Sequence, residues 1–459
     1  MFLITSLVAL ATAGTSMPQL TLLEVLRQAR DNNPQVLAAD AQVIAQDAQT
    51  KIPRALWYPN AAALIEAIGA TTNNSTATVL TNASVDLPRI GATAISNNSS
   101  WGPNATTLGA VGVRQQLFDF GRISSQSSAA DKALEAERAH ADGVARDAVF
   151  YAAMAYYDVL GARAVTQTSA QAVERARALL AFVVAGIDRG LRPQIERLRM
   201  EADLQRFEAQ RIRSLGALTN ARANLAAAIG AQALEVDVVD DAPEFLGCDA
   251  RTPTVVEATE RAEPTDPELR EARLRADAQH ENARAARTQA YPNLYLTGAL
   301  SARNGGAEPS SGDATSGNGF VPSVQNWSVG LIFQIPIFDA SVNAKVDAAE
   351  AGERALRKRA EAVRIGVVTS AAQTVRNLAV AHEALPALER ARDAAQGNYA
   401  QADARYKAGL GTSVELADAE ALRVDAEIQQ VLGAHAVARA RLAVLRALSE
   451  DMTQIEARP

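Results

Sequence analysis

The side chains that most often carry chemistry are scattered along this chain instead of being grouped. Metal sites and nucleophilic centres need two or more such groups at a fixed spacing. The four histidines stand singly, with no second histidine one helical turn away and no cysteine nearby: His140, His280, His382 and His435. The one cysteine, Cys248, excludes an intramolecular disulfide and a thiolate metal cage. No glycine-rich phosphate loop, serine elbow or pair of acids occurs in a strand–turn–helix setting, so we expect no enzyme activity, no metal and no cofactor.

Composition narrows the class of protein. Of the 459 residues, 48% are hydrophobic and 21% are charged, and the net charge is only -7, so a disordered chain is excluded. Because basic and acidic residues nearly balance, there is no sign of a broad cationic surface for nucleic acid. No apolar run approaches the ~18–20 residues of a membrane-spanning helix, which excludes a helical membrane protein.

The first residues, 1–16, form an apolar run that ends in small side chains. Such a run is typical of a secretory signal peptide, although no Lys or Arg precedes it here. A frayed apolar N-terminus or a misplaced start is the alternative. If the run is a signal peptide, the rest of the chain works outside the cytoplasm.

Short motifs recur in the same order along the chain, so the sequence predicts two internal structural repeats. Asn33-Pro34 and the tripeptide Tyr58-Pro59-Asn60 return as Asp266-Pro267 and Tyr291-Pro292-Asn293, at the same mutual spacing. Two further pairs follow: Leu117-Phe118-Asp119 with Ile337-Phe338-Asp339, and Arg189-Gly190-Leu191 with Ala408-Gly409-Leu410. We therefore place a first repeat at residues 17–247 and a second repeat at residues 248–459.

Each repeat is expected to contain a leading helix, a β-hairpin, a long helix and a return helix. In the first repeat they fall at residues 21–51, with a stop at Pro53, and then at 58–119, 122–188 and 194–229. In the second repeat they fall at 267–289, 291–338, 341–406 and 413–449, and Pro386 should kink the long helix. A helix of about 65 residues spans on the order of 100 Å, which is typical of a coiled coil or an extended helical assembly.

The hairpins have the pattern of strands that cross a bilayer. Between Trp327 and Ile337, apolar side chains alternate with a mixed set, so one face is fully apolar, as a lipid-facing strand requires. Aromatic residues gather at the strand ends: Trp57, Tyr58, Phe118, Phe120, Tyr291, Phe333 and Phe338. Amphipathic rings favour the headgroup level, so we interpret these as membrane-interface aromatics. The alternative is simple packing where strand meets helix.

Several motifs stand out in combination: Asn33-Pro34, the twin Tyr-Pro-Asn tripeptides, the run from Leu117 to Arg122, Ala155-Tyr156-Tyr157, and the run from Arg405 to Ala419. Together they resemble the TolC family of outer-membrane efflux proteins, over essentially the whole chain after the signal. The resemblance implies a mixed α/β membrane protein: a trimeric 12-stranded transmembrane β-barrel, with four strands per chain, continued by a long periplasmic α-helical barrel. The strand count agrees, because the smallest known membrane barrels have about 8 strands and four strands need partner copies.

The resemblance also implies where such a tunnel closes. In the family, acids, a tyrosine and an arginine narrow the passage near the helix–helix turns at its periplasmic end. Carried over by motif position, the acids are Glu196, Glu415 and Asp418, and the tyrosine is Tyr406. Gly411 replaces the family's arginine, so the cation would come from one of four others: Arg192, Arg197, Arg199 or Arg405. For the three acids the alternative is a helix-start role, because the first turns of a helix favour carboxylates.

The expected function is an exit duct in the bacterial outer membrane. It would serve a tripartite efflux or type I secretion system, and small molecules or proteins would pass through it passively from the periplasm to the exterior. The implied partners are two further copies in a homotrimer, a periplasmic adaptor (membrane fusion) protein, an inner-membrane pump of the RND, MFS or ABC type, and outer-membrane lipid, but no nucleic acid. The alternative is a structural periplasmic coiled-coil protein without a pore, and the alternating hairpins argue against it.

Overall fold

The computed structural model describes residues 19–71, 101, 103–240, 252–304 and 324–453. The expected signal peptide at 1–16 and Cys248 lie outside these residues. The chain divides into two compact units, which are described separately. The helical unit comprises Met1–Gln42, Arg138–Glu271 and Glu361–Pro459, and the sheet unit comprises Val43–Glu137 and Ala272–Ala360. Each unit contains segments of both repeats.

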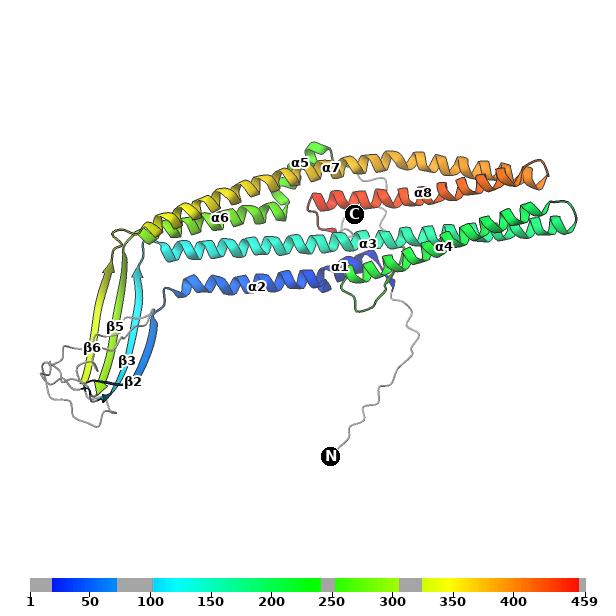
Figure 1. Ribbon diagram of the computed structural model, residues 1–459. Coiled ribbons are helices and arrows are strands. Elements are labelled where there is room, and N and C mark those ends of the chain that lie inside the picture. The colour runs from blue at the N-terminus through cyan, green and yellow to red at the C-terminus, as the bar shows by residue number, and fades with distance from the viewer. Residues whose placement is uncertain (1–18, 72–100, 102, 241–251, 305–323, 454–459) are drawn as a thin grey trace, which may run out of the picture. The chain divides into compact units, whose positions relative to one another are not determined.

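The sheet unit is built around one antiparallel sheet of four strands, in the order β2-β3-β5-β6 (Figure 1). The strands are β2 (Asn60–Thr71), β3 (Pro103–Phe118), β5 (Asn293–Asn304) and β6 (Val324–Gln334). Each repeat supplies one hairpin, and β3 pairs with β5 to join the two, with Val113 opposite Gly298. Strands β2 and β6 are therefore the edges of the sheet, and each has one side unpaired among the described residues.

Strand pairing sorts the side chains of this sheet into two faces, because residues paired in register point the same way. One face, which we call the apolar sheet face, carries large apolar side chains that are all exposed: Ile65, Val111, Val113, Leu296, Leu300, Trp327, Val329, Leu331 and Phe333. The opposite face, which we call the polar sheet face, carries Arg114, Gln116, Thr297 and Ser301 beside apolar Leu64, Leu108 and Ile332. A continuous exposed apolar patch marks a surface that meets lipid or protein.

The leading segment of each repeat is two helices, so the expectation of a single leading helix was wrong. In the first repeat, α1 (Leu22–Asn32) and α2 (Pro34–Ala55) are separated by Asn33, whose backbone is extended. Pro34 disfavours helical backbone at the residue before it, which explains the break. The second repeat has α5 (Val255–Thr265), which the sequence did not predict, then an extended Asp266 and α6 (Pro267–Arg287). The recurring Asn-Pro and Asp-Pro pairs are therefore helix junctions.

Proline does not end the helices in two other places. Pro53 lies near the end of α2, which continues to Ala55, so the expected stop at this residue was wrong. Proline removes one N–H donor, and near a helix end this loss interrupts little of the hydrogen-bond ladder. Pro386 lies inside α7 (Ala340–Lys407), which continues through it. The other long helix is α3 (Arg122–Asp188), and the return helices are α4 (Gln194–Ala228) and α8 (Ser413–Ala447).

The helical unit has an apolar core of its own. Its largest buried side chains include Tyr156 of α3, Leu26 of α1, Leu225 of α4 and Leu442 of α8. A parallel pair of very short strands, β1 (Gln19–Leu20) and β4 (Asp237–Val238), contributes Val238 to this core. Asp237 accepts hydrogen bonds from Arg163 at 2.5 Å and from Arg222 at 2.7 Å, which fixes β4 to α3 and α4.

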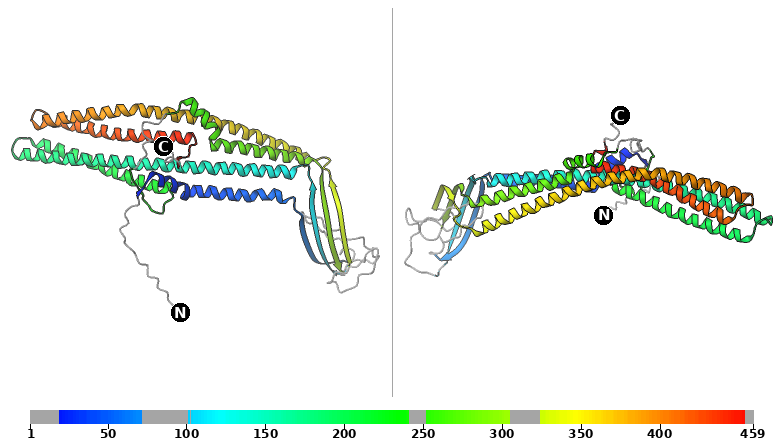
Figure 2. Two further views of the ribbon diagram at one scale, coloured as in Figure 1. Left: turned by 180° about the vertical axis from the view of Figure 1, so that it is seen from behind. Right: turned by 90° about the horizontal axis from the view of Figure 1, so that it is seen from above.

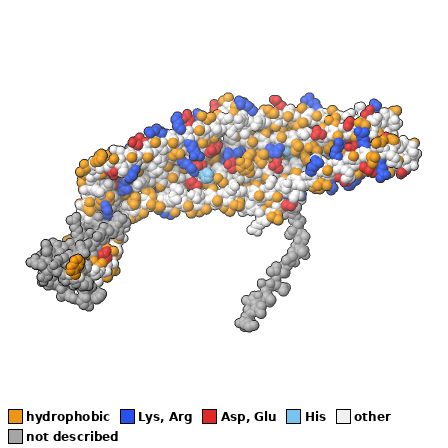
Figure 3. Space-filling view, viewed as in Figure 1, with side chains coloured by type: hydrophobic (Ala, Val, Ile, Leu, Met, Phe, Trp, Pro, Cys, Tyr) orange, Lys and Arg blue, Asp and Glu red, His pale blue; other side chains and the backbone are white. Residues whose placement is uncertain are grey.

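Charged side chains of both signs are interspersed over the helices. On the face drawn in Figure 3, blue Lys and Arg side chains and red Asp and Glu side chains are scattered among orange apolar ones. Many of these charges form ion pairs along or between helices, such as Arg177 with Glu208 at 2.9 Å. None of the described helices is long and apolar enough to cross a membrane.

Candidate functional site at the helix tips

The two helical hairpins of the helical unit, α3/α4 and α7/α8, lie side by side and turn at equivalent motif positions (Figures 1 and 2). Gly190 forms the first turn and Gly409 the second, and both have positive φ, at 67° and 74°. This left-handed backbone favours glycine and is typical of a helix C-terminus. The N–H groups of Leu191 and Leu410 donate back to carbonyls of the preceding helix at 2.9 Å. We call these two matching turns the helix tips.

Three side chains join the two tips. The hydroxyl of Tyr406 donates to Glu196 Oε2 at 2.7 Å, and Arg192 donates to the same oxygen at 2.9 Å. Arg192 also donates to the backbone oxygen of Tyr406 at 3.2 Å, and its guanidinium lies 3.9 Å from the centre of the Tyr406 ring. Arg192 and Glu196 belong to the first tip and Tyr406 to the second, so the contacts made with Tyr406 connect the two hairpins of one chain. We call the three residues the tip link.

Tyr406 is the most buried member of the tip link. It is only 1% exposed and packs in a small core with Val183, Met200 and Leu416. Burial, and then the hydrogen bond to Glu196, raise the pKa of Tyr406 above its ordinary value. The phenol therefore stays protonated around neutral pH and remains a hydrogen-bond donor to Glu196.

One of the four arginines that the sequence offered as a cationic partner lies in the tip link. Arg192 supplies the cation of the tip link, whereas Arg197 pairs with Glu201 at 2.8 Å and Arg405 donates to the Leu410 oxygen at 3.4 Å. A Cβ atom at Gly411 would come within 3.1 Å of the backbone nitrogen of Tyr406, so a side chain there would crowd the second tip. The spacing of Arg192 and Glu196, one helical turn apart, was the sequence signal for this pair.

Glu415 and Asp418 do not take part in the tip link. Glu415 completes a capping box at the start of α8: its carboxylate accepts from the Thr412 N–H at 3.3 Å, and its own N–H donates to Thr412 Oγ1 at 3.2 Å. Both acids are exposed. Of the three acids predicted at the constriction, Glu196 lies in the tip link, Glu415 caps the start of α8 and Asp418 lies on the surface of α8, and their place in a constriction stays a prediction.

The aromatic residues expected at the membrane interface lie where the strands of the sheet unit end. The rings of Phe118 and Phe120 meet edge to face at 4.8 Å, and those of Phe120 and Tyr291 lie 5.6 Å apart. All seven predicted aromatics are exposed: Trp57, Tyr58, Phe118, Phe120, Tyr291, Phe333 and Phe338. Their role at a membrane interface stays a prediction.

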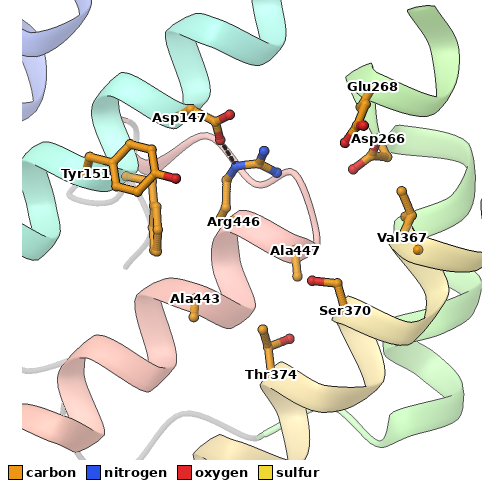
Figure 4. A pocket seen from close by; sticks show the side chains of 12 residues that line it. Asp147, Tyr151, Asp266, Glu268, Val367, Ser370, Thr374, Ala443, Arg446 and Ala447 are labelled. Atoms are coloured by element: carbon orange, nitrogen blue, oxygen red, sulfur yellow. Dashed lines mark hydrogen bonds and ion pairs between the residues drawn. The ribbon is translucent and has the colours of Figure 1, made fainter. Parts of the chain in front are cut away.

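A pocket of about 330 Å³ lies between α3, α6, α7 and α8 of the helical unit (Figure 4). Arg446 pairs with Asp147 on one side of it, and Asp266 and Glu268 lie opposite. Asp266 already accepts a hydrogen bond from the Leu269 N–H at 2.9 Å as the cap of α6. No residue predicted for the site lines this pocket. Among the described residues, no group of three or more His, Cys, Asp or Glu side chains is placed to hold a metal ion.

The sequence profile of the outer membrane efflux protein family matches residues 25–231 and 259–450, one segment in each repeat. The chain belongs to this family. No curated protein matches this efflux protein. The predicted family, its function as an outer-membrane efflux channel and the two-repeat architecture are thereby confirmed.

Solved structures of outer-membrane channels share the fold of this efflux protein. The outer-membrane channel OprN matches with a TM-score of 0.76 and 20% identity, covering 94% of this chain and 90% of that chain. CusC matches with a TM-score of 0.78 and 18% identity, covering 96% of both chains. The CmeC outer membrane channel of Campylobacter jejuni matches with a TM-score of 0.75 and 15% identity, covering 98% of this chain and 93% of that chain.

Proposed function

We propose that three copies of this efflux protein join edge to edge and form a passive exit duct from the periplasm through the outer membrane. The observation that carries the proposal is the apolar sheet face, which is exposed and flanked by the free edges of β2 and β6. Open edges and a large exposed apolar patch are unfavourable in water. Closing three such sheets into a 12-stranded barrel pairs every edge and turns the apolar sheet face toward lipid.

In this arrangement the polar sheet face lines the lumen, and the helices continue the duct into the periplasm. A periplasmic adaptor protein would connect the duct to an inner-membrane pump of the RND, MFS or ABC type, as the family resemblance implies. The pump supplies the energy, and the duct performs no chemistry and needs no cofactor. A pore-less structural coiled-coil protein is the weaker candidate, because it leaves the apolar sheet face without a role.

The tip link holds the duct closed at its periplasmic end in this proposal. Its three side chains connect the two hairpins of each chain through the hydrogen bond from Tyr406 to Glu196, the hydrogen bond from Arg192 to the Tyr406 oxygen and the Arg192–ring contact. Hydrogen bonds to charged groups contribute about 1.5–3 kcal/mol each. Separating the hairpins breaks these contacts in all three copies, so the closed state is favoured until a partner offsets the loss.

Fractionation and light scattering test the duct. We expect the exported chain to be recovered with outer membranes, to resist extraction by high salt, to behave as a trimer in detergent and to conduct in planar bilayers. Deleting Tyr291–Phe338 removes β5 and β6, so the barrel cannot close and the trimer should be lost. Recovery as a soluble monomer, or as a stable dimer without conductance, would contradict the duct and favour the pore-less alternative.

Replacing Glu415 and Asp418 together by Ala is expected to lower the cation selectivity of the duct and to weaken block by multivalent cations. In a trimer these acids and Glu196 place about nine carboxylates around one passage, which concentrates cations. Losing the capping box costs only about 0.5–2 kcal/mol per chain, so the trimer yield should stay nearly intact. Reversal potentials in planar bilayers measure the effect. Wild-type selectivity in this double variant would leave the two acids as surface and helix-start residues only.

A further inference from the structure

A second ion cluster connects the same two hairpins, further along the helices from the tips than the tip link. Arg175 of α3 donates through Nε to Glu420 Oε1 of α8 at 2.9 Å. Arg423 of α8 lies 3.0 Å from the other carboxylate oxygen, Glu420 Oε2. Glu420 is thus held between two arginines, one from each hairpin. We call Arg175, Glu420 and Arg423, together with Glu427 and Tyr399 beside them, the Glu420 cluster.

Glu427 and Tyr399 complete the Glu420 cluster. Glu427 lies 3.7 Å from Arg175 and 3.7 Å from Arg423, so two arginines face two glutamates. The guanidinium of Arg423 also lies 4.0 Å from the ring centre of Tyr399 on α7. Glu420 is only 6% exposed, and the cavity beside it has about 20 Å³, room for a single water. The cluster is therefore a buried, charged contact between the hairpins.

We propose that the Glu420 cluster is a second closure of the duct, which responds to pH: protonation of Glu420 favours the packed hairpins and its ionisation favours their separation. This inference rests on the proposed function as an exit duct. Its physical basis is that a buried carboxylate loses hydration, and that nearby charges restore only part of what is lost. The packed and separated hairpins therefore differ in how tightly they bind a proton at Glu420.

The charges around Glu420 set the direction of the effect. Burial raises the pKa of Glu420 to about 7; Arg175 opposes this rise, and Glu427 and Asp403 add to it. The titratable and charged groups that face Glu420 come from all four packed helices: Arg175 of α3, Asp203 of α4, Tyr399 and Asp403 of α7, and Arg423 and Glu427 of α8. Burial outweighs the attraction of the arginine.

The pH window follows from linkage. When the hairpins separate, Glu420 meets water and its pKa returns toward the ordinary value of 4.5. The pKa of Glu420 is higher in the packed state, so a bound proton stabilises that state. This stabilisation is complete below pH about 4.5 and is lost as the pH rises to about 7. Acidification across this window should raise the ratio of packed to separated hairpins by up to about two orders of magnitude per chain. The duct closes as the pH falls.

Conductance of the full-length trimer in planar bilayers between pH 4.5 and 8 tests this closure. The wild-type conductance is expected to fall on acidification below pH 7. Glu420→Gln is neutral at every pH, so it should stay in the low-conductance state at pH 7–8 and lose the pH dependence of this window. Arg175→Gln removes the attraction that opposes the raised pKa, so the upper end of the window should move above pH 7.

Glu174→Gln is the matched control, because Glu174 is an exposed carboxylate beside Arg175 and pairs with Arg177 at 2.8 Å. It should keep the wild-type pH profile. Hydrogen exchange along α8, corrected for the intrinsic pH dependence of exchange, is a second measurement: protection near Glu420 should rise on acidification in the wild type and stay constant in Glu420→Gln.

A wild-type pH profile in Glu420→Gln, or a wild type that does not respond between pH 4.5 and 7, overturns the closure and leaves the duct intact. A wild-type chain that forms no pore overturns the proposed function instead, and hydrogen exchange still tests the cluster. If Glu420→Gln does not assemble, Arg175→Gln is the deciding variant. The closure is overturned if the conductance of Arg175→Gln still changes only below pH 7.

Discussion

Val329→Arg is expected to abolish recovery of the assembled trimer from outer membranes. Val329 lies in the middle of β6, on the apolar sheet face, and is 70% exposed. Arginine on the lipid face near the bilayer midplane costs about 2–4 kcal/mol, and a trimer carries this cost three times. The total is comparable with the whole stability of many folded proteins, about 5–15 kcal/mol. Gel electrophoresis of unheated outer-membrane extracts measures the trimer.

Ser328→Arg is the matched control for this variant. Ser328 precedes Val329 on β6 and is paired with Ala299, so it lies on the polar sheet face. In the proposed duct an arginine there projects toward the aqueous lumen, so the trimer yield should stay close to that of the wild type. Equal loss of trimer in both variants would contradict the assignment of the apolar sheet face to lipid.

Arg192→Gln is expected to raise the open probability of the duct at least tenfold. The variant loses the ion pair with Glu196, the hydrogen bond to the Tyr406 oxygen and the contact with the Tyr406 ring. Hydrogen bonds to charged groups contribute about 1.5–3 kcal/mol, and about 1.4 kcal/mol corresponds to a factor of ten in an equilibrium. Single-channel recording in planar bilayers measures the open probability.

Arg197→Gln is the control for the tip link, because Arg197 belongs to the same helix start and pairs with Glu201 on the surface at 2.8 Å. Exposed pairs at this spacing contribute about 0.3–0.5 kcal/mol, so the open probability should stay within about twofold of the wild type. Both variants should keep the wild-type trimer yield. A wild-type open probability in Arg192→Gln would mean that the closed duct does not depend on the tip link.

The repeats and the long elements were readable from the sequence because their signals are local. The absence of proline across 123–188 and the alternation around Val329 each specify one kind of backbone within a single segment. The turns at Gly190 and Gly409 were readable too, because each repeat carries a glycine at the equivalent motif position. The break at Asn33-Pro34 also has a local cause, because proline disfavours helical backbone at the residue before it, and the prediction of one leading helix was wrong at this point.

Contacts between distant segments could not be predicted in this way. Arg175 and Glu420 are separated by 245 positions, and both lie on helices dense in Arg and Glu. Nothing in the local pattern distinguishes these two from exposed neighbours such as Glu174 and Arg177. The choice of Arg192 as the partner of Tyr406 depends in the same way on how the two tips pack. Burial decides which of these charged side chains join the two hairpins, and burial depends on the tertiary fold.

The contrast between the two units has a consequence for how a chain matures. The helical unit buries an apolar core around Tyr156 within a single chain. In the part of the chain that the structure describes, the sheet unit exposes its apolar face and one side each of β2 and β6. In the proposed duct, the core of the helical half can form within one chain, whereas the sheet half must wait for lipid and two other copies. Because three chains must meet, the rate of completion should depend steeply on their number at the membrane, and a chain short of partners is exposed to aggregation and proteolysis.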